Sequence, residues 1–411
     1  MHLMDIDQIR SQFPQLKEKV YGRQLVYLDN AATSLRPVSV AEKWAEMSLR
    51  HNSNLHRAVH KTAVDATEEY ESTRAAVAAF IGAAAPEEIV FTSGTTQSSN
   101  LLASCLEHGN FFAEGDEILI CEAEHHSNIV PWQMVAARKG LKIKVLPIDD
   151  RGQILISELG NLLTPRTKIC AVAQASNVLG IINPIRKIAD ICHANGTLVF
   201  VDGAQGIPHL PTDVKEMDCD FYAFSGHKMY AAPGTGILYG KRALLEALPP
   251  YMGGGEMIES VSWEKTTYAP VPRRFEAGTQ NISGVPSLRP AMEMCKLLAG
   301  REITAETERV KTFLLGFFSA HPDITLYGNP DDPAEKLPIF SITVKGAHHE
   351  DLALILDKMG IATRSGQMCA EPLMDGFGVT GMLRASFAPY NTMQEAVYFT
   401  ECLQKAIDML K

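Results

Sequence analysis

A lysine after one apolar segment and an acid at the end of another are the residues of this sequence best suited to covalent chemistry. Lys228 ends the run from Asp220 to Lys228, and Asp202 directly follows the apolar run Leu198 to Val201. A lysine can form a Schiff base with an aldehyde cofactor, and a carboxylate can keep a ring nitrogen protonated so that the ring accepts electrons. The pair therefore predicts a pyridoxal 5′-phosphate (PLP) site, although an acid at a strand end is by itself often only a turn former.

The segment Thr92-Ser93-Gly94-Thr95-Thr96 is a candidate binding site for the phosphate group of such a cofactor. It follows a predicted strand and opens a predicted helix. Gly94 allows the backbone to approach an anion closely, the amides of a helix N-terminus point toward it, and the hydroxyl groups of Thr95 and Thr96 add donors. An ordinary helix N-cap would use the same residue types, so the segment gains its meaning from the lysine and the acid described above.

His125 is a candidate for contact with the flat ring of the cofactor. It comes shortly after the apolar run Glu117 to Cys121 and is followed by His126. An imidazole at this place could stack on the ring, whereas the alternative is that both histidines are surface residues. Adjacent side chains do not converge on one ion, and no two of the eight cysteines are separated by only two residues, so we expect no metal site.

Cys369 differs from most of the other cysteines because it lies in a polar loop bounded by glycine and proline, from Arg364 to Pro372. A cysteine beside a cation such as Arg364 can be partly thiolate, and the thiolate is the nucleophilic form. The residues alone leave open the alternative that this thiol is incidental.

Arg384 lies within a predicted strand that is otherwise apolar, and an arginine in such a place needs a partner. A guanidinium group can bind both oxygens of a substrate carboxylate and so fix the orientation of an amino acid. We therefore predict a carboxylate-binding role, with a surface arginine as the alternative.

Seven short apolar segments, with helical stretches between several of them, would form the framework that positions these residues. The predicted strands are 88–92, 117–121, 142–146, 169–173, 198–202, 221–224 and 236–239. Strands that alternate with helices favour an α/β fold with a large, mostly parallel sheet covered on both faces. Ligands bind beyond the carboxyl ends of such strands, where Thr92, Asp202 and Ser225 are expected.

The pattern changes in the last third of the chain to that of a smaller α+β domain. A looser stretch (249–272) and a long helical region that begins near Pro286 lead to it. We then expect strands at 339–344, 361–364 and 382–387, a helix at 350–359 and a final helix. Because 411 residues are too many for one small core, we predict an N-terminal segment (1–20), a large cofactor-binding domain (21–290) and a small C-terminal domain (291–411) that carries the cysteine loop.

The composition argues against several classes of function. With 46% hydrophobic and 21% charged residues, the chain resembles an ordinary globular protein. A net charge of -10 without a dense basic block argues against a nucleic-acid surface. The first residues include acids where a signal peptide has a basic region, and no later segment reaches the roughly 18 apolar residues of a membrane span. We therefore expect a cytoplasmic protein that binds neither nucleic acid nor a membrane.

Four motifs together resemble those of the class V aminotransferase group of fold-type I PLP enzymes. They are Gly94-Thr95-Thr96, Glu124-His125, Asp202-Gly203-Ala204-Gln205 and Ser225-Gly226-His227-Lys228. More narrowly, the chain resembles the SufS/CsdA-like (group II) cysteine desulfurases from Leu28 to its final helix. The resemblance implies a homodimer with shared active sites that converts L-cysteine to L-alanine. It also implies a sulfur acceptor protein of SufE or SufU type and a role in iron–sulfur cluster assembly.

The resemblance further implies a role for each residue of the site. Lys228 would carry the cofactor, Asp202 would pair with the pyridine nitrogen, and Gln205 would lie near the ring hydroxyl group. His125 would stack on the ring and handle protons near the substrate thiol. The phosphate contacts would be Thr95, Thr96, Ser225 and His227, with Thr279 donated by the other subunit. The substrate pocket would be lined by Arg384, Asn177, His56 and Arg364, with Arg57 nearby.

Cys369 matches the cysteine that forms a persulfide in this family, but the loop departs from the family pattern. Where SufS-like enzymes commonly have Arg-x-Gly-His-His-Cys, this chain has Gln367 and Met368 before the cysteine, which removes two imidazoles. The loop is short and begins with Arg364, which favours the SufS-like group over the group with a longer, mobile loop.

Three alternative functions remain open on the sequence. A selenocysteine lyase could use the same site on L-selenocysteine without needing Cys369. Another class V PLP enzyme, such as an aminotransferase, would leave Cys369 incidental. A catalytically weak scaffold that binds partners would have no need of the Lys228, Asp202 and Gln205 set, which argues against it.

Overall fold

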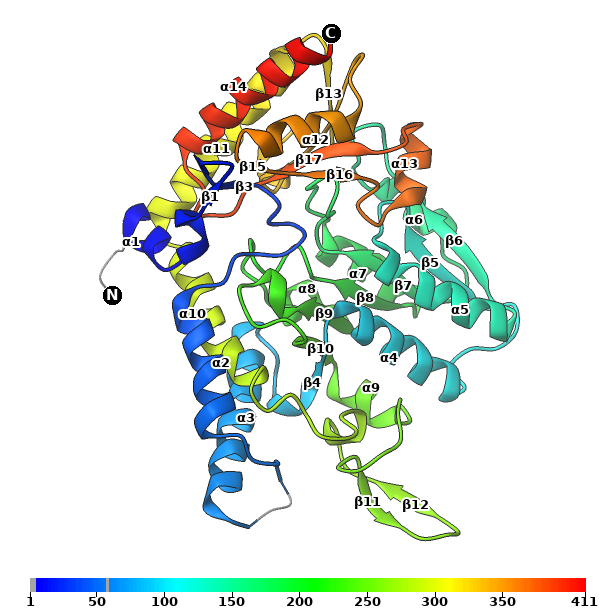
Figure 1. Ribbon diagram of the computed structural model, residues 1–411. Coiled ribbons are helices and arrows are strands. Elements are labelled where there is room, and N and C mark those ends of the chain that lie inside the picture. The colour runs from blue at the N-terminus through cyan, green and yellow to red at the C-terminus, as the bar shows by residue number, and fades with distance from the viewer. Residues whose placement is uncertain (1–4, 57–58) are drawn as a thin grey trace.

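The computed structural model describes residues 5–56 and 59–411, which form a large sheet flanked by helices and a smaller sheet beside it (Figure 1). The large sheet contains, in spatial order, β4 (Ile89–Thr92), β10 (Gly236–Gly240), β9 (Phe221–Ser225), β8 (Leu198–Asp202), β7 (Thr167–Ala173), β5 (Glu117–Cys121) and β6 (Lys142–Leu146). Neighbouring strands are parallel except at β10, which is antiparallel to both of its neighbours. The predicted, mostly parallel α/β sheet is therefore confirmed.

Successive side chains of each central strand enter different hydrophobic cores, because neighbouring residues of a strand point to opposite faces of a sheet. In β5, Ile118 and Ile120 pack with helices α4 (Thr95–His108) and α5 (Val130–Lys139). Leu119 and Cys121 belong to the other core. Its helices include α3 (Lys61–Phe80), α7 (Ile185–Ala194) and α10 (Leu288–Leu298). Coverage on both faces explains why these strands are apolar throughout rather than alternating.

The remaining elements of this part are short, apart from one helix. They are α2 (Val38–Arg50), α6 (Ile156–Leu162), α8 (Val214–Met217), α9 (Arg242–Ala247), β11 (Ile258–Val261) and β12 (Thr266–Tyr268). The last two pair as an antiparallel hairpin within the stretch 249–272 and project at the bottom of Figure 1. The sequence predicted only an irregular segment there, because the hairpin is largely exposed and lacks the alternation of a half-buried strand.

A four-stranded antiparallel sheet forms the C-terminal layer. Its strands, in spatial order, are β13 (Ile324–Tyr327), β14 (Ile339–Val344), β17 (Met382–Ser386) and β16 (Arg364–Gly366). The helices of this layer are α11 (Arg301–Ala320), α12 (His349–Lys358), α13 (Glu371–Phe377) and α14 (Met393–Leu410). The strand expected at 361–364 is instead two short strands in different sheets, β15 (Ile361–Ala362) and β16, because the chain switches partners between them.

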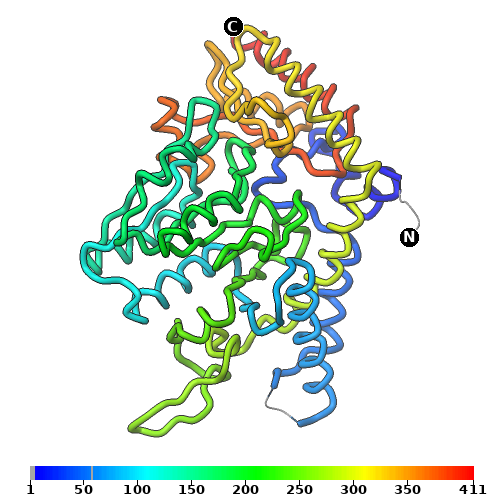
Figure 2. The backbone as a smooth tube through the Cα atoms, turned by 180° about the vertical axis from the view of Figure 1, so that it is seen from behind, coloured from blue at the N-terminus to red at the C-terminus, as the bar shows by residue number. Residues whose placement is uncertain are grey.

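The N-terminal segment lies against this C-terminal layer, as the view from behind also shows (Figure 2), while its Ile9, Phe13 and Leu16 join the core that contains α3, α7 and α10. After α1 (Ile6–Ser11) and the hairpin of β1 (Lys19–Val20) with β2 (Arg23–Gln24), β3 (Val26–Tyr27) pairs in parallel with β15. Val26 and Leu28, which we expected in the large domain, lie in the core of the C-terminal layer. Arg10 of α1 also forms an ion pair of 2.8 Å with Glu395 of α14.

Within the described ranges, no helix is both long and apolar enough to cross a membrane.

Candidate active site

A cavity of about 270 Å³ lies where the carboxyl ends of β7, β8 and β9 face the C-terminal layer. This is the edge at which ligands bind to parallel sheets. Twelve of the residues that the sequence predicted for the site line it. They are Thr95, Thr96, His125, Asn177, Asp202, Gln205, Ser225, His227, Lys228, Arg364, Cys369 and Arg384.

Lys228 and Asp202 both line this cavity, and their opposite charges interact. Asp202 ends β8 and is buried, and Lys228 lies in the 3₁₀ turn Gly226–Lys228 that directly follows β9. Removal from bulk water lowers the pKa of Lys228, and the Asp202 carboxylate opposes this effect. Burial likewise raises the pKa of Asp202 against the opposing charge of Lys228. The lysine can therefore lose its proton more readily than a surface lysine, as covalent or base chemistry requires.

His125 is held as a neutral imidazole beside this pair. Burial, with smaller contributions from the charges of Lys228, His126 and Arg384, lowers its pKa to about 3. Its Nδ1 accepts the backbone N–H of Ser127 at 3.1 Å, so the proton of the neutral ring lies on Nε2. The Ser127 hydroxyl group lies 2.8 Å from the same Nδ1 and can donate its proton to it. Sequence reasoning missed Ser127, whose only signal is its position two residues after the histidine.

The N-terminus of α4 provides an anion-binding surface at one side of the cavity. The backbone N–H of Thr95 donates to Ser225 Oγ at 2.9 Å, and the two hydroxyl groups also lie 2.9 Å apart. A side chain at Gly94 would come within 3.2 Å of Ser225 Oγ, so glycine keeps this approach open. The first N–H groups of a helix have no partner within the helix and point toward such a ligand. The donor set fits a phosphate group.

Arg384 is almost fully buried and two of its three guanidinium nitrogens are already engaged. Nη1 donates to the carbonyl of Asn177 at 2.9 Å, and Nη2 lies 3.0 Å from the Asp29 carboxylate. Nε has no hydrogen-bond partner among the described residues. A buried donor without a partner is costly, so a carboxylate that enters the cavity would relieve this cost. Asp29 was not predicted as a site residue; it fixes Arg384 and faces Arg364 at 3.9 Å.

The cysteine loop closes the cavity from the C-terminal layer. Met368 and Cys369 adopt left-handed backbone conformations, with φ of 54° and 56°, which cost roughly 1–2 kcal/mol for each residue with a side chain. Contacts from the large sheet stabilise this conformation. Asn177 Nδ2 donates to the carbonyl of Met368 at 2.8 Å, and the backbone N–H of His126 donates to the carbonyl of Cys369 at 2.9 Å. Asn177, predicted to line the substrate pocket, therefore also fixes the loop.

We predict that iodoacetamide will label one cysteine of the native protein, Cys369. This cysteine is exposed, whereas the other seven are buried. Burial also raises the pKa of Cys105 to about 12, so little reactive thiolate is present there. Peptide mass mapping after brief labelling, with a denatured sample as the control, checks this result. Early labelling of Cys105 in native protein would contradict the structure.

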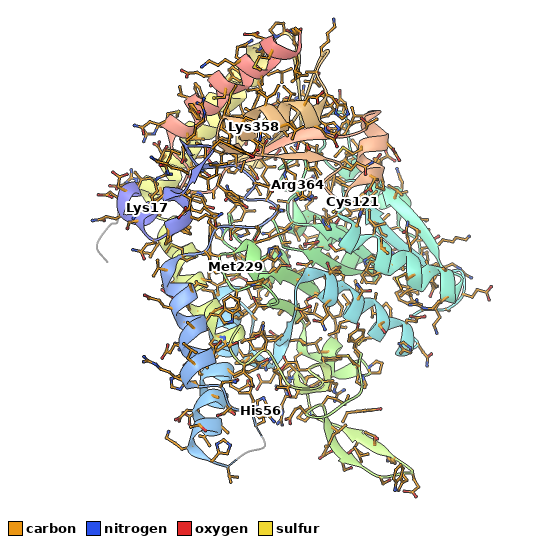
Figure 3. The ribbon with its side chains drawn as sticks, in the orientation of Figure 1. Lys17, His56, Cys121, Met229, Lys358 and Arg364 are labelled. Atoms are coloured by element: carbon orange, nitrogen blue, oxygen red, sulfur yellow. The ribbon has the colours of Figure 1, made fainter. Side chains whose placement is uncertain are left out.

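Two predicted site residues do not line the cavity of their own chain. His56 packs edge-on against Tyr70 and lies 3.5 Å from Glu71 of α3. Figure 3 shows it near the foot of the molecule, well away from Arg364. Thr279 is exposed and also lies outside the lining. Arg57 lies outside the described residues.

The chain is similar to known proteins over nearly its whole length. The family model described as Aminotransferase class-V matches residues 26–399. A probable cysteine desulfurase of Vibrio cholerae is 42% identical over 408 residues, which cover 99% of this chain and 100% of the relative. A cysteine desulfurase of Cronobacter sakazakii is 44% identical, with 95% of each chain covered. Among solved structures, the cysteine desulfurase CsdA of Escherichia coli superposes with a TM-score of 0.89 at 38% identity and full coverage of both chains.

Proposed function

Since the chain belongs to the class-V aminotransferase family and, within it, to the cysteine desulfurases, we propose that its cavity converts L-cysteine to L-alanine and transfers the sulfur to Cys369 as a persulfide. The observation that carries this proposal is the placement of an exposed cysteine, Cys369, on the same cavity as the Lys228 and Asp202 pair. An aminotransferase alone would have no use for a thiol there.

Enzymes of these families depend on PLP, and the residues of the cavity fit that cofactor. Lys228 would bind its aldehyde carbon, and the buried Asp202 carboxylate would face its ring nitrogen. Gln205 is oriented by a 2.7 Å hydrogen bond from its Nε2 to the carbonyl of Ala31, which suits a place beside the ring hydroxyl group. The helix N-terminus at Thr95 and Thr96, with the side chains of Ser225 and His227, would bind the phosphate. His125 would lie on the ring.

The substrate would be oriented before any bond changes. Arg384 would bind the α-carboxylate of L-cysteine through its unpaired Nε, which leaves the Cα–H bond directed toward Lys228. The lysine amine, whose pKa is lowered, would then remove the Cα proton. When bound, PLP supplies the electron sink that makes this proton acidic.

Cys369 would then take the sulfur. Its thiolate attacks the substrate sulfur, so that a sulfur–sulfur bond forms and the Cβ–S bond breaks. The electron pair of the broken bond stays on the substrate carbon, which is protonated to give the methyl group of alanine. The neutral His125, with its proton on Nε2, would donate a hydrogen bond from Nε2 to the substrate sulfur. No external oxidant is required, because the sulfur is transferred at the persulfide level.

We also propose a homodimer, with Thr279 of each subunit contacting the phosphate bound by the other. The exposure of Thr279 and its absence from its own cavity support this arrangement. Exposure of Cys369 suits transfer of its sulfur to an acceptor protein, which we propose to be of SufE or SufU type and to serve iron–sulfur cluster assembly. A reducing cytoplasm suits the eight cysteines, which all occur as free thiols.

The proposal is tested by incubating PLP-loaded protein with L-cysteine and measuring alanine together with persulfide on the peptide that contains Cys369. We expect one persulfide per alanine formed in the first turnover, and continued turnover only when a reductant or acceptor removes the sulfur. Bound cofactor with neither product would contradict the proposal and would direct the same assay to L-selenocysteine.

We predict that Arg384→Lys raises the KM for L-cysteine by about 10- to 100-fold, because a lysine cannot place a donor where Nε lies and a charged hydrogen bond contributes about 1.5–3 kcal/mol. Steady-state kinetics of alanine formation measure the change. Arg186→Lys is the matched control, since Arg186 forms an exposed pair with Asp190 of the same helix. An unchanged KM in the Arg384 variant would exclude the carboxylate-binding role.

A further inference from the structure

The loop that carries Cys369 has a third attachment, formed by side chains that the proposed reaction does not use. His126 Nε2 and the carboxylate of Glu371 form an ion pair, and the Glu371 backbone N–H donates to the same nitrogen at 3.4 Å. Glu371 begins α13, two residues after Cys369, whereas His126 directly follows His125 and begins the 3₁₀ turn His126–Asn128 after β5. The pair therefore joins the helix behind the nucleophile to the segment that carries the proton-handling imidazole.

The ion pair is placed where the loop most needs support. Met368 and Cys369 both have left-handed backbone conformations, which persist only when surrounding contacts impose them. Asn177 secures the carbonyl before the cysteine, and the backbone of His126 secures the carbonyl of the cysteine itself. The ion pair of Glu371 fixes the residues that follow. Together these contacts span both sides of Cys369.

The chemistry of the pair is specific to its residue types. The Glu371 backbone N–H donates to Nε2, and the Glu371 carboxylate lies against the same nitrogen, so the main chain and the side chain at the start of α13 both contact the imidazole. Glutamine at position 371 would keep a polar side chain of the same length against this nitrogen, whereas alanine would remove the side-chain contact. Both side chains are partly exposed, at 36% for His126 and 44% for Glu371, so the pair can open without unfolding the core.

We propose that His126 and Glu371 are positioning residues that hold the Cys369 loop in the conformation from which its thiol attacks the substrate sulfur. The attack rests on the proposed function, but the effect on loop order does not. Opening of the pair would free the loop to move away from the cavity, which slows sulfur transfer without weakening the binding of L-cysteine at Arg384.

The test compares PLP-loaded wild type with Glu371→Ala, Glu371→Gln and His126→Ala. Hydrogen–deuterium exchange of the peptide spanning 366–377 and the rate of Cys369 alkylation report loop order directly. In Glu371→Ala we expect faster exchange, faster alkylation and a kcat for alanine formation lowered by about tenfold or more, with KM within about twofold, because misplacement of a reacting atom by about 1 Å can cost 10²-fold. Glu371→Gln should recover much of the loss.

A matched control is Glu46→Ala, which removes the α2 carboxylate of the His51–Glu46 pair; Glu46 is 43% exposed, close to the 44% of Glu371. If hydrogen–deuterium exchange and Cys369 alkylation in Glu371→Ala proceed at the rates of this control, the proposed positioning role of His126 and Glu371 is excluded. The double variant His126→Ala/Glu371→Ala should be no worse than either single variant, since they remove the same contact; full additivity would overturn the proposal. Absence of alanine formation in wild type would exclude the proposed function. The exchange and alkylation rates would still test whether His126 and Glu371 order the Cys369 loop.

Discussion

Replacing Lys228 with alanine is expected to lower alanine formation from L-cysteine by at least about 10⁴-fold. The substitution removes two roles at once, the covalent attachment of the cofactor and the base that takes the Cα proton, and a positioned base alone contributes up to about 10⁴-fold. No described side chain replaces it, because the neighbouring His125 is held neutral by its pKa of about 3 and donates from Nε2. The measurement is alanine release by PLP-supplemented protein at saturating L-cysteine.

The control for this prediction is another lysine that faces acids on the same sheet. Lys241 follows β10 and lies 2.9 Å from Asp220 and 3.0 Å from Asp218, outside the cavity. Lys241→Ala removes a lysine–aspartate contact without touching the site, so its turnover should stay near that of wild type. Loss of the base alone should lower turnover by at least about 100-fold. Residual turnover of the Lys228 variant above about 1% of wild type would therefore show that another group serves as the base.

The central sheet and the edge that carries the cavity could be predicted because their signals are local. The strands expected at 117–121, 142–146 and 198–202 coincide with β5, β6 and β8. Once the strands are parallel, their carboxyl ends must share one edge, and this rule alone brings Asp202 and Lys228 together.

The contacts that sequence reasoning missed join segments that are far apart in the chain. Asp29 and Arg384 are 355 positions apart, and nothing near Asp29 indicates that it will fix a guanidinium group. The pairing of β3 with β15 likewise joins two strands of only two residues each, too short for a periodic pattern. A charge or a short strand gains its partner from tertiary packing, which a local pattern does not encode.

His56 illustrates a different limit. A family resemblance assigns a residue to a substrate pocket but does not say which copy of the chain supplies it. The structure places His56 against Tyr70 and Glu71 of its own chain, remote from its own cavity, so any contribution to a substrate pocket would have to come from a second subunit.

Substitution of Cys369 with alanine is the second change with a large expected effect. Removal of the nucleophile should lower alanine formation from L-cysteine by at least about a hundredfold, as the loss of a nucleophile does in other enzymes that use covalent catalysis. Cofactor content should not change, because Cys369 is exposed and its thiol is not among the proposed cofactor contacts. The measurements are alanine release and the absorbance of the bound cofactor before and after addition of L-cysteine.

The activities of the Cys369 variant toward L-cysteine and L-selenocysteine distinguish a persulfide-forming desulfurase from an enzyme in which this thiol is incidental. L-Selenocysteine can lose its selenium without a thiol acceptor, so the Cys369 variant should keep activity toward it while losing activity toward L-cysteine. Cys402→Ala is the matched control, because it makes the same chemical change at a buried cysteine of α14, remote from the cavity. Loss of both activities in the Cys369 variant would point to damage of the pocket rather than removal of a nucleophile. Full retention of L-cysteine turnover would leave the thiol incidental, and the reaction would then be one that releases sulfur without a persulfide on the enzyme.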